Sequence, residues 1–280
     1  TPTDPSTPST GPSTPPTGPS TPKVGTNIKD AAGKATYKVT STNKTNPTVE
    51  FIAPVNKKAK SVTVPATIKV NGITYKVTSI ATNGLAWCTM KQLIIGKNVR
   101  SIGQGACAGC MSLVSVTMGE SVSFIDEGAF SSCYSLKDIS WPSAVTEIKK
   151  GMFLGCSLED FTIPATVTRI GEQAFSMAKI TNLYCQSSVP PSVFSDTFFL
   201  VSNMTVHVPE GSLVSYQNAT VWKDYIITDD IPSAIQYVSC DDESIILKNS
   251  FNLNGQKNTK LKGIVIKQYS DGTIKKVLKR

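Results

Sequence analysis

An isoleucine recurs along the middle of the chain at spacings of 22 or 23 residues, and the residues that follow it align at fixed offsets. The five isoleucines are Ile80, Ile102, Ile125, Ile148 and Ile170. A period of this length is typical of a solenoid, in which each repeat forms one turn of a stacked coil. The sequence therefore predicts an elongated fold rather than a globular domain with a catalytic cleft.

Within each unit, a small and then a larger residue follow the isoleucine, and a short run of alternating apolar residues closes the unit. Ile139-x-Trp141 is one such run. Alternation at period two marks a half-buried strand, whereas the segment before it has the spacing of a turn or two of helix. We expect a β-rich solenoid with one strand and a short helical or irregular return per repeat.

Alternating runs of the same kind occur before the first isoleucine and after the last. Counting from Val62-x-Val64 to Val206-x-Val208 gives seven strands over residues 61–209. An insertion of about eight residues centred on Asn71-Gly72 separates the first two strands. Asn-Gly between two apolar alternating segments is a strong β-hairpin signal, so we expect this insertion to form a protruding ribbon.

The repeated unit resembles the leucine-rich repeat of the BspA-like family of bacterial surface proteins, which reads roughly I-G-x-x-A-F-x-x-C-x-x-L-x-x-I-x-I-P. The resemblance covers about residues 61–209 and recurs in register. It implies an extracellular or cell-surface protein with adhesin-like, non-catalytic binding through the strand face of the solenoid. The partners it implies are a host extracellular matrix protein, a mucin glycan or another bacterial surface protein.

Composition divides the rest of the chain into further segments. Residues 1–24 are mostly Thr, Pro and Ser, which cannot form a core, so we expect a disordered stalk, either a surface anchor or an interdomain linker. Residues 25–60 have strand-like alternation and form an N-terminal β cap. Residues 210–228 resemble the family's closing segment, a short helix opened by Ser212. Residues 229–280 resemble a C-terminal β-module of Bacteroidetes surface proteins, which acts as a sorting tail or a fixed end cap.

The net charge of +8 does not indicate nucleic-acid binding, because the excess lies at the two ends of the chain. Residues 23–60 hold eight Lys and two acidic residues, whereas residues 61–209 hold ten basic and nine acidic residues. A solenoid that binds nucleic acid would carry its basic residues along the repeats. We expect no nucleic-acid partner, and membrane contact only through an N-terminal anchor.

Four of the seven cysteines occupy one repeat offset. In-register side chains on neighbouring coils stack in a column about 4.8 Å apart, so we expect an interior ladder of free, unreactive thiols. The ladder consists of Cys88, Cys110, Cys133 and Cys156.

Cys107 and Cys110 form a CxxC motif, which elsewhere indicates redox or zinc chemistry. The chain has no second CxxC, and its single histidine is His207, so a zinc site lacks ligands. We expect no metal, no cofactor and no enzyme activity. A thiol enzyme at Cys107 or Cys110 is the alternative of a different class.

The outward-facing residues of the strands are the remaining candidates for function. Tyr184 and His207 lie on adjacent strands, and acidic and hydroxyl side chains precede them on the same face. The candidate ligand-binding residues are Tyr184, His207, Asp138, Asp160, Ser140 and Thr162. We place the pair Asp229-Asp230 in a turn. If these residues form only solvated sheet, the protein is a structural spacer with no specific ligand.

Overall fold

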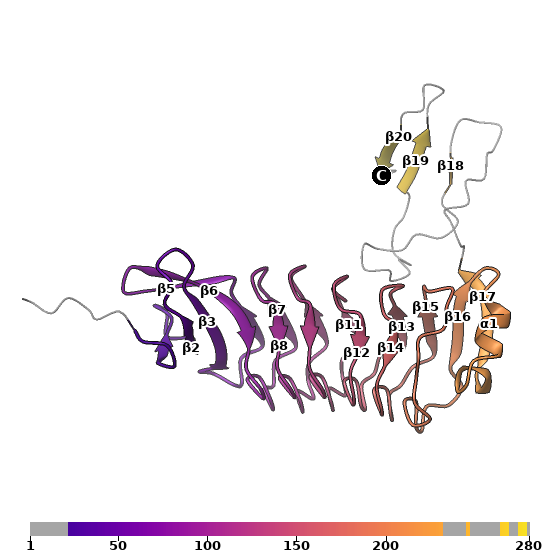
Figure 1. Cartoon of the computed structure of the whole chain (residues 1–280), viewed down its shortest axis with the longest axis horizontal. Helices are drawn as coiled ribbons and strands as arrows, with labels where there is room; N and C mark the ends of the chain where they lie inside the picture. Colours follow the sequence, from indigo (N-terminus) through magenta and orange to yellow (C-terminus); the bar gives the residue numbers. More distant parts are fainter. Residues whose placement is uncertain (1–21, 232–244, 247–263, 269–273, 279–280) are drawn as a thin grey trace, which may run out of the picture.

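The computed structural model describes residues 22–231 and the backbone of three further strands, β18 (Ile245–Ile246), β19 (Ile264–Gln268) and β20 (Ile274–Leu278). These three pair antiparallel in the order β18-β19-β20. The expected stalk up to residue 21, and the side chains and connections of the expected C-terminal module after residue 231, lie outside the described residues. Residues 61–209 form a solenoid whose coils run side by side along the long axis (Figure 1).

The predicted strands form one parallel column, here called the second ladder. Neighbouring strands pair in register, as Val62 with Leu93 and Leu183 with Val206. Hydrogen bonding between strands is interrupted once, between β11 and β13. The seven predicted strands and one more are β4 (Ser61–Val64), β7 (Gln92–Ile95), β9 (Ser115–Thr117), β11 (Asp138–Ile139), β13 (Asp160–Ile163), β15 (Asn182–Cys185), β16 (Thr205–Pro209) and β17 (Ile226–Ile231).

Five coils contain a second strand, which the sequence did not predict apart from the hairpin arm that begins at Ile73. These strands end at the recurring isoleucines and stack in parallel, as Ile80 on Ile102 and Ile148 on Ile170. We call this column the first ladder. Its members are β6 (Ile73–Ile80), β8 (Ser101–Ile102), β10 (Phe124–Ile125), β12 (Glu147–Ile148) and β14 (Arg169–Ile170), with pairing interrupted between β10 and β12.

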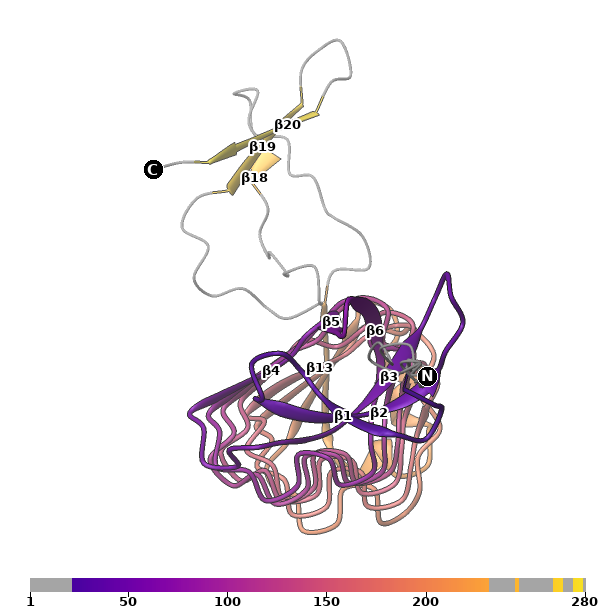
Figure 2. The same cartoon turned by 90° about the vertical axis from the view of Figure 1, so that its left-hand side faces the viewer.

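The expectation of a helical return is wrong, and the irregular alternative holds. The segment from each isoleucine to the cysteine consists of turns, and two residues per coil have positive φ, such as Gly128 (60°) and Ser132 (59°). A left-handed residue ends a helix, so a pair of them only four residues apart prevents one. The turn amides instead bond to the next coil, as Phe130 N to the Met152 carbonyl at 3.1 Å. Figure 2 looks along the coil axis, where these turns overlie one another.

A column of phenylalanine rings fills the interior of the later coils. Phe130, Phe153 and Phe175 are fully buried, and neighbouring ring centroids lie 5.9 and 5.5 Å apart with interplanar angles of 9° and 19°. Phe198 continues the column at 5.6 Å from Phe175. The apolar side chains of all coils belong to this one continuous core.

Additional elements cover the N-terminal end of the first ladder. β1 (Asn27–Lys29), β2 (Ala35–Ser41) and β3 (Thr48–Pro54) pair antiparallel, and β3 then pairs in parallel with β6. β5 (Thr67–Val70) and β6 form the predicted hairpin, in which Asn71 and Gly72 have φ of 49° and 80°. Both central residues therefore adopt the positive φ that a type I′ turn requires.

At the C-terminal end, α1 (Leu213–Gln217) and the 3-10 helix η1 (Trp222–Asp224) pack against the last coils. Ser212 precedes α1 but its side chain makes no capping hydrogen bond. The Trp222 ring lies 5.5 Å from Phe198 and its indole donates to the Pro191 carbonyl at 2.9 Å. The aromatic column therefore continues into the closing segment.

We predict that Phe130→Ala lowers the free energy of unfolding by about 3–5 kcal/mol, because the ring is fully buried and stacks on Phe153. Urea denaturation followed by circular dichroism measures the change. Phe199→Ala is the matched control, since that ring is 54% exposed, and should cost less than about 1 kcal/mol. A loss below about 1 kcal/mol for Phe130→Ala would contradict the interior column.

Candidate binding surface

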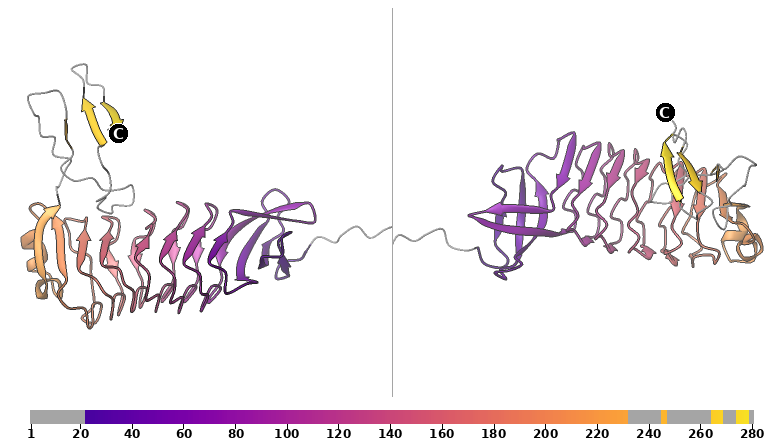
Figure 3. Two further views of the ribbon diagram at one scale, coloured as in Figure 1. Left: turned by 180° about the vertical axis from the view of Figure 1, so that it is seen from behind. Right: turned by 90° about the horizontal axis from the view of Figure 1, so that it is seen from above.

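The outward side chains of the last four strands of the second ladder form one connected cluster, here called the polar face. Strand register sets their neighbours, because Tyr184 pairs with His207 and His207 with Thr228 across adjacent parallel strands. Figure 3 shows the coils that carry these strands side by side. The polar face consists of Asp160, Asn182, Tyr184, His207, Thr228 and Asp230.

His207 is the centre of this cluster. Its Nδ1 lies 2.9 Å from both carboxylate oxygens of Asp230 and 3.1 Å from Thr228 Oγ1, and its Nε2 lies 3.2 Å from Asn182 Oδ1. The Asn182 amide nitrogen donates to Asp160 Oδ1 at 2.7 Å, which fixes its oxygen toward the imidazole. Because Asn182 Oδ1 and the Asp230 carboxylate can only accept, the ring nitrogen that faces each of them is the donor when it carries a proton. The His207 side chain is only 14% exposed, so the ring is held in place.

Tyr184 covers one face of the imidazole. The two rings stack with centroids 4.5 Å apart and planes 18° from parallel. Burial raises the pKa of the Tyr184 hydroxyl, and the carboxylates of Asp160 and Asp230 raise it further. The hydroxyl therefore stays protonated and able to donate a hydrogen bond over the physiological pH range.

The arrangement around His207 differs from that of a catalytic triad. In a triad, the carboxylate and the nucleophilic hydroxyl contact opposite nitrogens of the imidazole. Here Asp230 and Thr228 both contact Nδ1, and the amide of Asn182 occupies Nε2. Thr228 is therefore not placed for activation through a proton transfer to Nε2. The groups are suited to hydrogen bonding and charge recognition.

The structure brings together three of the six predicted residues: Tyr184, His207 and Asp160. Asp138 is exposed on β11, whose sheet is not hydrogen-bonded to β13. The Ser140 hydroxyl accepts a hydrogen bond from the Met118 backbone amide at 2.7 Å, so it stabilises the neighbouring coil. The outward exposure expected for Thr162 is wrong, since this residue is 5% exposed. Its register partner on β15 is Tyr184, and in-register side chains of neighbouring strands lie side by side on one face of a sheet.

Three members of the polar face were not among the candidate residues: Asn182, Thr228 and Asp230. Asp229-Asp230 was expected in a turn, but both residues lie on β17, which pairs in parallel with β16. Asp230 thereby reaches His207, and Thr228 lies beside it. The β-branched run Ile226-Ile227-Thr228 is a strand signal that could have revealed this eighth strand.

The predicted cysteine ladder consists of buried thiols, and three of the four bond to the preceding coil. Cys110 Sγ donates to the Leu85 carbonyl at 3.0 Å, Cys133 Sγ to the Cys107 carbonyl at 3.2 Å, and Cys156 Sγ to the Phe130 carbonyl at 3.2 Å. All six cysteines in the described part of the chain are free. The thiols of Cys110, Cys133 and Cys156 therefore satisfy backbone carbonyls inside the core.

The CxxC motif shares this interior position, because Cys107 and Cys110 have no solvent exposure. A hydrogen bond with Cys110 and burial raise the pKa of Cys107 well above that of a free thiol. The same hydrogen bond lowers the pKa of Cys110 against the effect of burial. Neither sulfur is accessible to a substrate. Among residues 22–231 there is also no cluster of three or more side chains that could hold a metal ion.

Comparison with protein families gives one match. A model of the BspA type leucine rich repeat region matches residues 59–204 in six copies. A search of curated proteins finds no significant match. No helix in the described residues is long and apolar enough to cross a membrane.

Solved structures of bacterial leucine-rich repeat proteins are also similar. One from Bacteroides ovatus is 21% identical over 66% of this chain, with a TM-score of 0.48, and this chain spans 55% of its length. One from Treponema pallidum is 20% identical over 74% of this chain and 100% of its own, with a TM-score of 0.49. A leucine-rich cell surface protein from Faecalibacterium prausnitzii is 16% identical over 74% of this chain and 98% of its own, with a TM-score of 0.34.

We predict that the six described thiols do not react with iodoacetamide in the native protein at pH 8. All are buried, and burial raises the pKa of Cys88 to about 11 and of Cys156 to about 12. Alkylation is measured by mass spectrometry in a Cys240→Ser variant, which retains only these six thiols. All six should be alkylated in urea, whereas rapid native alkylation of Cys107 or Cys110 alone would favour a thiol enzyme.

We also predict that stability falls as pH rises above about 9. The Cys88 and Cys156 pKa values are raised from 9.0, so folding favours the protonated thiols. Their contribution is fully present below pH 9 and is lost as pH rises toward 11 and 12. Urea denaturation between pH 8 and 11 should show that the free energy of unfolding falls as pH rises. Cys156→Ala should reduce the slope of this fall by up to about 1.4 kcal/mol per pH unit. An unchanged slope would contradict the assignment to this thiol.

Proposed function

Because the chain belongs to the BspA-type leucine-rich repeat family, we propose that it is a non-catalytic binding protein whose polar face contacts a partner outside the cell. The observation that carries this proposal is the hydrogen-bonded cluster centred on His207. Extended strand faces of solenoids are their usual binding surfaces.

The organisation of the cluster supports recognition. Each polar group is fixed by another, so little side-chain entropy would be lost when a ligand binds. Asp160 and Asp230 remain exposed at the two sides of the partly buried His207 and Tyr184. A ligand that donates hydrogen bonds or carries positive charge would complement these carboxylates.

The absence of an activated nucleophile on the polar face supports a binding role over catalysis. Thr228 and Asp230 contact the same imidazole nitrogen, and the thiols of the CxxC motif are buried. Both observations, on the polar face and on the CxxC motif, concern residues 22–231. A protein that presents a fixed set of donors and acceptors without a reactive group is suited to adhesion.

We assign the protein to the cell surface or the extracellular space, with residues 1–24 as a stalk. The family and the Thr-, Pro- and Ser-rich composition of this segment support the assignment. The partners we propose are a host extracellular matrix protein, a mucin glycan or another bacterial surface protein. A folded solenoid held away from the envelope would expose the whole second ladder to such a partner.

We predict that the triple substitution Tyr184→Ala, His207→Ala and Asp160→Ala abolishes partner binding while the melting temperature stays within a few degrees. The full chain is applied to arrays of matrix proteins and mucin glycans, and affinities for the hits are then measured by surface plasmon resonance. Asp160→Asn removes one charge at constant shape and should weaken binding about tenfold or less.

The matched control changes outward residues of the same ladder on earlier coils, Gln92→Ala and Thr117→Ala, which should bind as the parent does. An equal loss of affinity in the control and in the triple variant would show that the partner does not contact the polar face. No binding to any surface on the arrays would instead favour a structural spacer that presents no specific ligand.

A further inference from the structure

The two ladders of the solenoid end differently at the N-terminus. The first ladder continues beyond β6 into β3, β2 and β1. The second ladder stops at β4, which pairs with β7 on one side, and no strand within the described residues pairs with its other side. One coil end is therefore covered, while the neighbouring sheet keeps an open edge.

The backbone groups on that edge can be identified from the hydrogen bonds on the opposite side. The carbonyls of Lys60 and Val64 accept bonds from the amides of Lys91 and Gly96, at 2.8 Å each, so these residues face β7. Backbone groups alternate in direction along a strand. The amide and carbonyl groups of Ser61 and Thr63 therefore point to the open edge.

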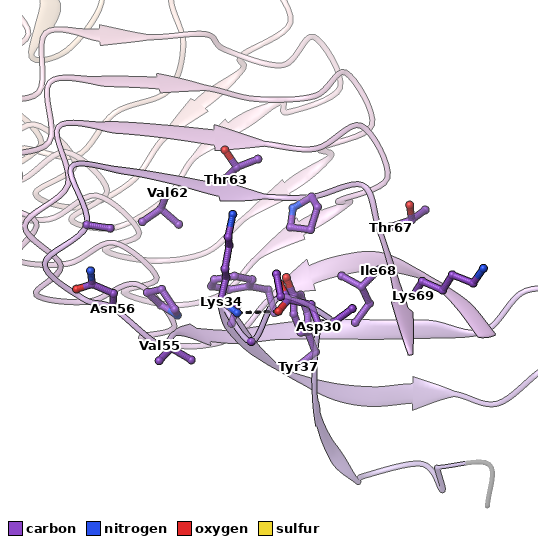
Figure 4. Close-up of a pocket in the computed structure, with 18 of the residues that line it drawn as sticks. Asp30, Lys34, Tyr37, Val55, Asn56, Val62, Thr63, Thr67, Ile68 and Lys69 are labelled. Atoms are coloured by element: carbon purple, nitrogen blue, oxygen red, sulfur yellow. Dashed lines mark hydrogen bonds between the residues drawn. The ribbon is translucent and has the colours of Figure 1, made fainter. Parts of the chain in front are cut away.

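The open edge lines a cleft of about 850 Å³, which lies between β4, β5, the β1–β2 turn and the segment after β3. Figure 4 shows the side chains that line it. Val62, Ile68 and Tyr37 provide apolar surface, while Ser61 and Thr63 contribute polar groups. A cleft of this volume is within the usual range for a bound ligand.

Tyr37 lines the inner wall of the cleft, and its side chain is 99% buried. Burial raises the pKa of its hydroxyl, and the nearby carboxylate of Asp30 raises it further. The Tyr37 hydroxyl therefore stays protonated and uncharged over the physiological pH range.

The lining of the cleft carries more positive than negative charge. Lys34 and Lys69 line it, and neither forms an ion pair with a described residue. The one acidic residue of the lining, Asp30, accepts a hydrogen bond from the Lys34 amide at 2.7 Å. Residues 23–60, which form much of the surroundings, contain eight Lys and two acidic residues. The local field therefore favours a negatively charged ligand.

We propose that this cleft binds an extended acidic peptide segment of a partner protein, which adds to β4 as a further strand of the second ladder. The peptide backbone would bond to the free amide and carbonyl groups of Ser61 and Thr63. Its apolar side chains would contact Val62, Ile68 and Tyr37, and its carboxylates would lie near Lys34 and Lys69. This site is at the opposite end of the second ladder from the polar face.

A peptide fits the cleft better than an anionic polysaccharide because of the unpaired strand edge. An extended peptide presents amides and carbonyls at the same alternating spacing as β4 and can satisfy both kinds of group. A polysaccharide would use the lysines without depending on the backbone of Thr63. This difference separates the two ligand classes experimentally.

The experiment measures binding of fluorescent octapeptides of alternating Val and Glu to the full chain by anisotropy. Replacing Glu by Lys in the peptide, or Lys34→Glu with Lys69→Glu in the protein, should weaken binding at least about tenfold. Two further peptides carry N-methyl groups on one or the other alternating set of residues. Strand addition predicts that only the set facing β4 abolishes binding, because only those amides pair with the edge.

Thr63→Pro tests the protein side of the same contact. Proline removes an amide on the open edge of an edge strand, a place where proline is tolerated, and it should weaken peptide binding about tenfold. Thr63→Val retains the amide and is the matched control, which should bind as the parent does.

Equal binding of both N-methylated peptides, or of the parent and Thr63→Pro, would overturn the proposal. So would binding of dextran sulfate without binding of the acidic peptide, since that result would assign the cleft to anionic polysaccharides. The N-methylated peptides use the unaltered protein, so their result does not depend on the folding of any variant.

Discussion

The stacking of like side chains between adjacent coils determines the rest of this structure. Each coil is too thin to bury its own apolar residues, so it must pack against the coils before and after it. The phenylalanine column shows the consequence, since the rings of Phe130, Phe153, Phe175 and Phe198 lie 5.5–5.9 Å apart and nearly parallel. The cysteine ladder follows the same rule, and three of its four thiols add a hydrogen bond to the preceding coil. A substitution at one interior offset therefore disturbs two interfaces.

This constraint explains why the interior could be predicted from the sequence and the backbone path only in part. Residues that must match their neighbours repeat visibly, and the isoleucine, phenylalanine and cysteine offsets are all buried. The first ladder was missed because most of its strands are two residues long, as at Phe124–Ile125, and two residues cannot show alternation. The helical return was wrong because positive φ at residues such as Ser132 leaves no signal in residue type. The glycines at equivalent positions, Gly109 and Gly155, and those four residues earlier, such as Gly105 and Gly151, hint at it.

The polar face could be predicted only where it follows the repeat. Register alone places Tyr184 beside His207, and the structure stacks their rings. Asp230 was missed because two consecutive aspartates favour a turn, whereas the preceding β-branched residues and pairing with β16 hold them in a strand. Thr162 was misplaced because periodicity gives the direction of a side chain but not how much of it the neighbouring coils leave exposed.

Both surfaces that we assign to binding lie where the repeat stops. Within the solenoid, each outward position is flanked by similar coils, so a regular surface offers the same contacts at every step. The last coils break this regularity, because β17 brings Asp230 against His207 and completes a cluster that no earlier described coil contains. The first coil breaks it differently, by leaving the β4 edge unpaired beside Lys34 and Lys69. A stacked fold therefore gains chemical specificity at its ends, while the repeats between them fix the distance and orientation of the two sites.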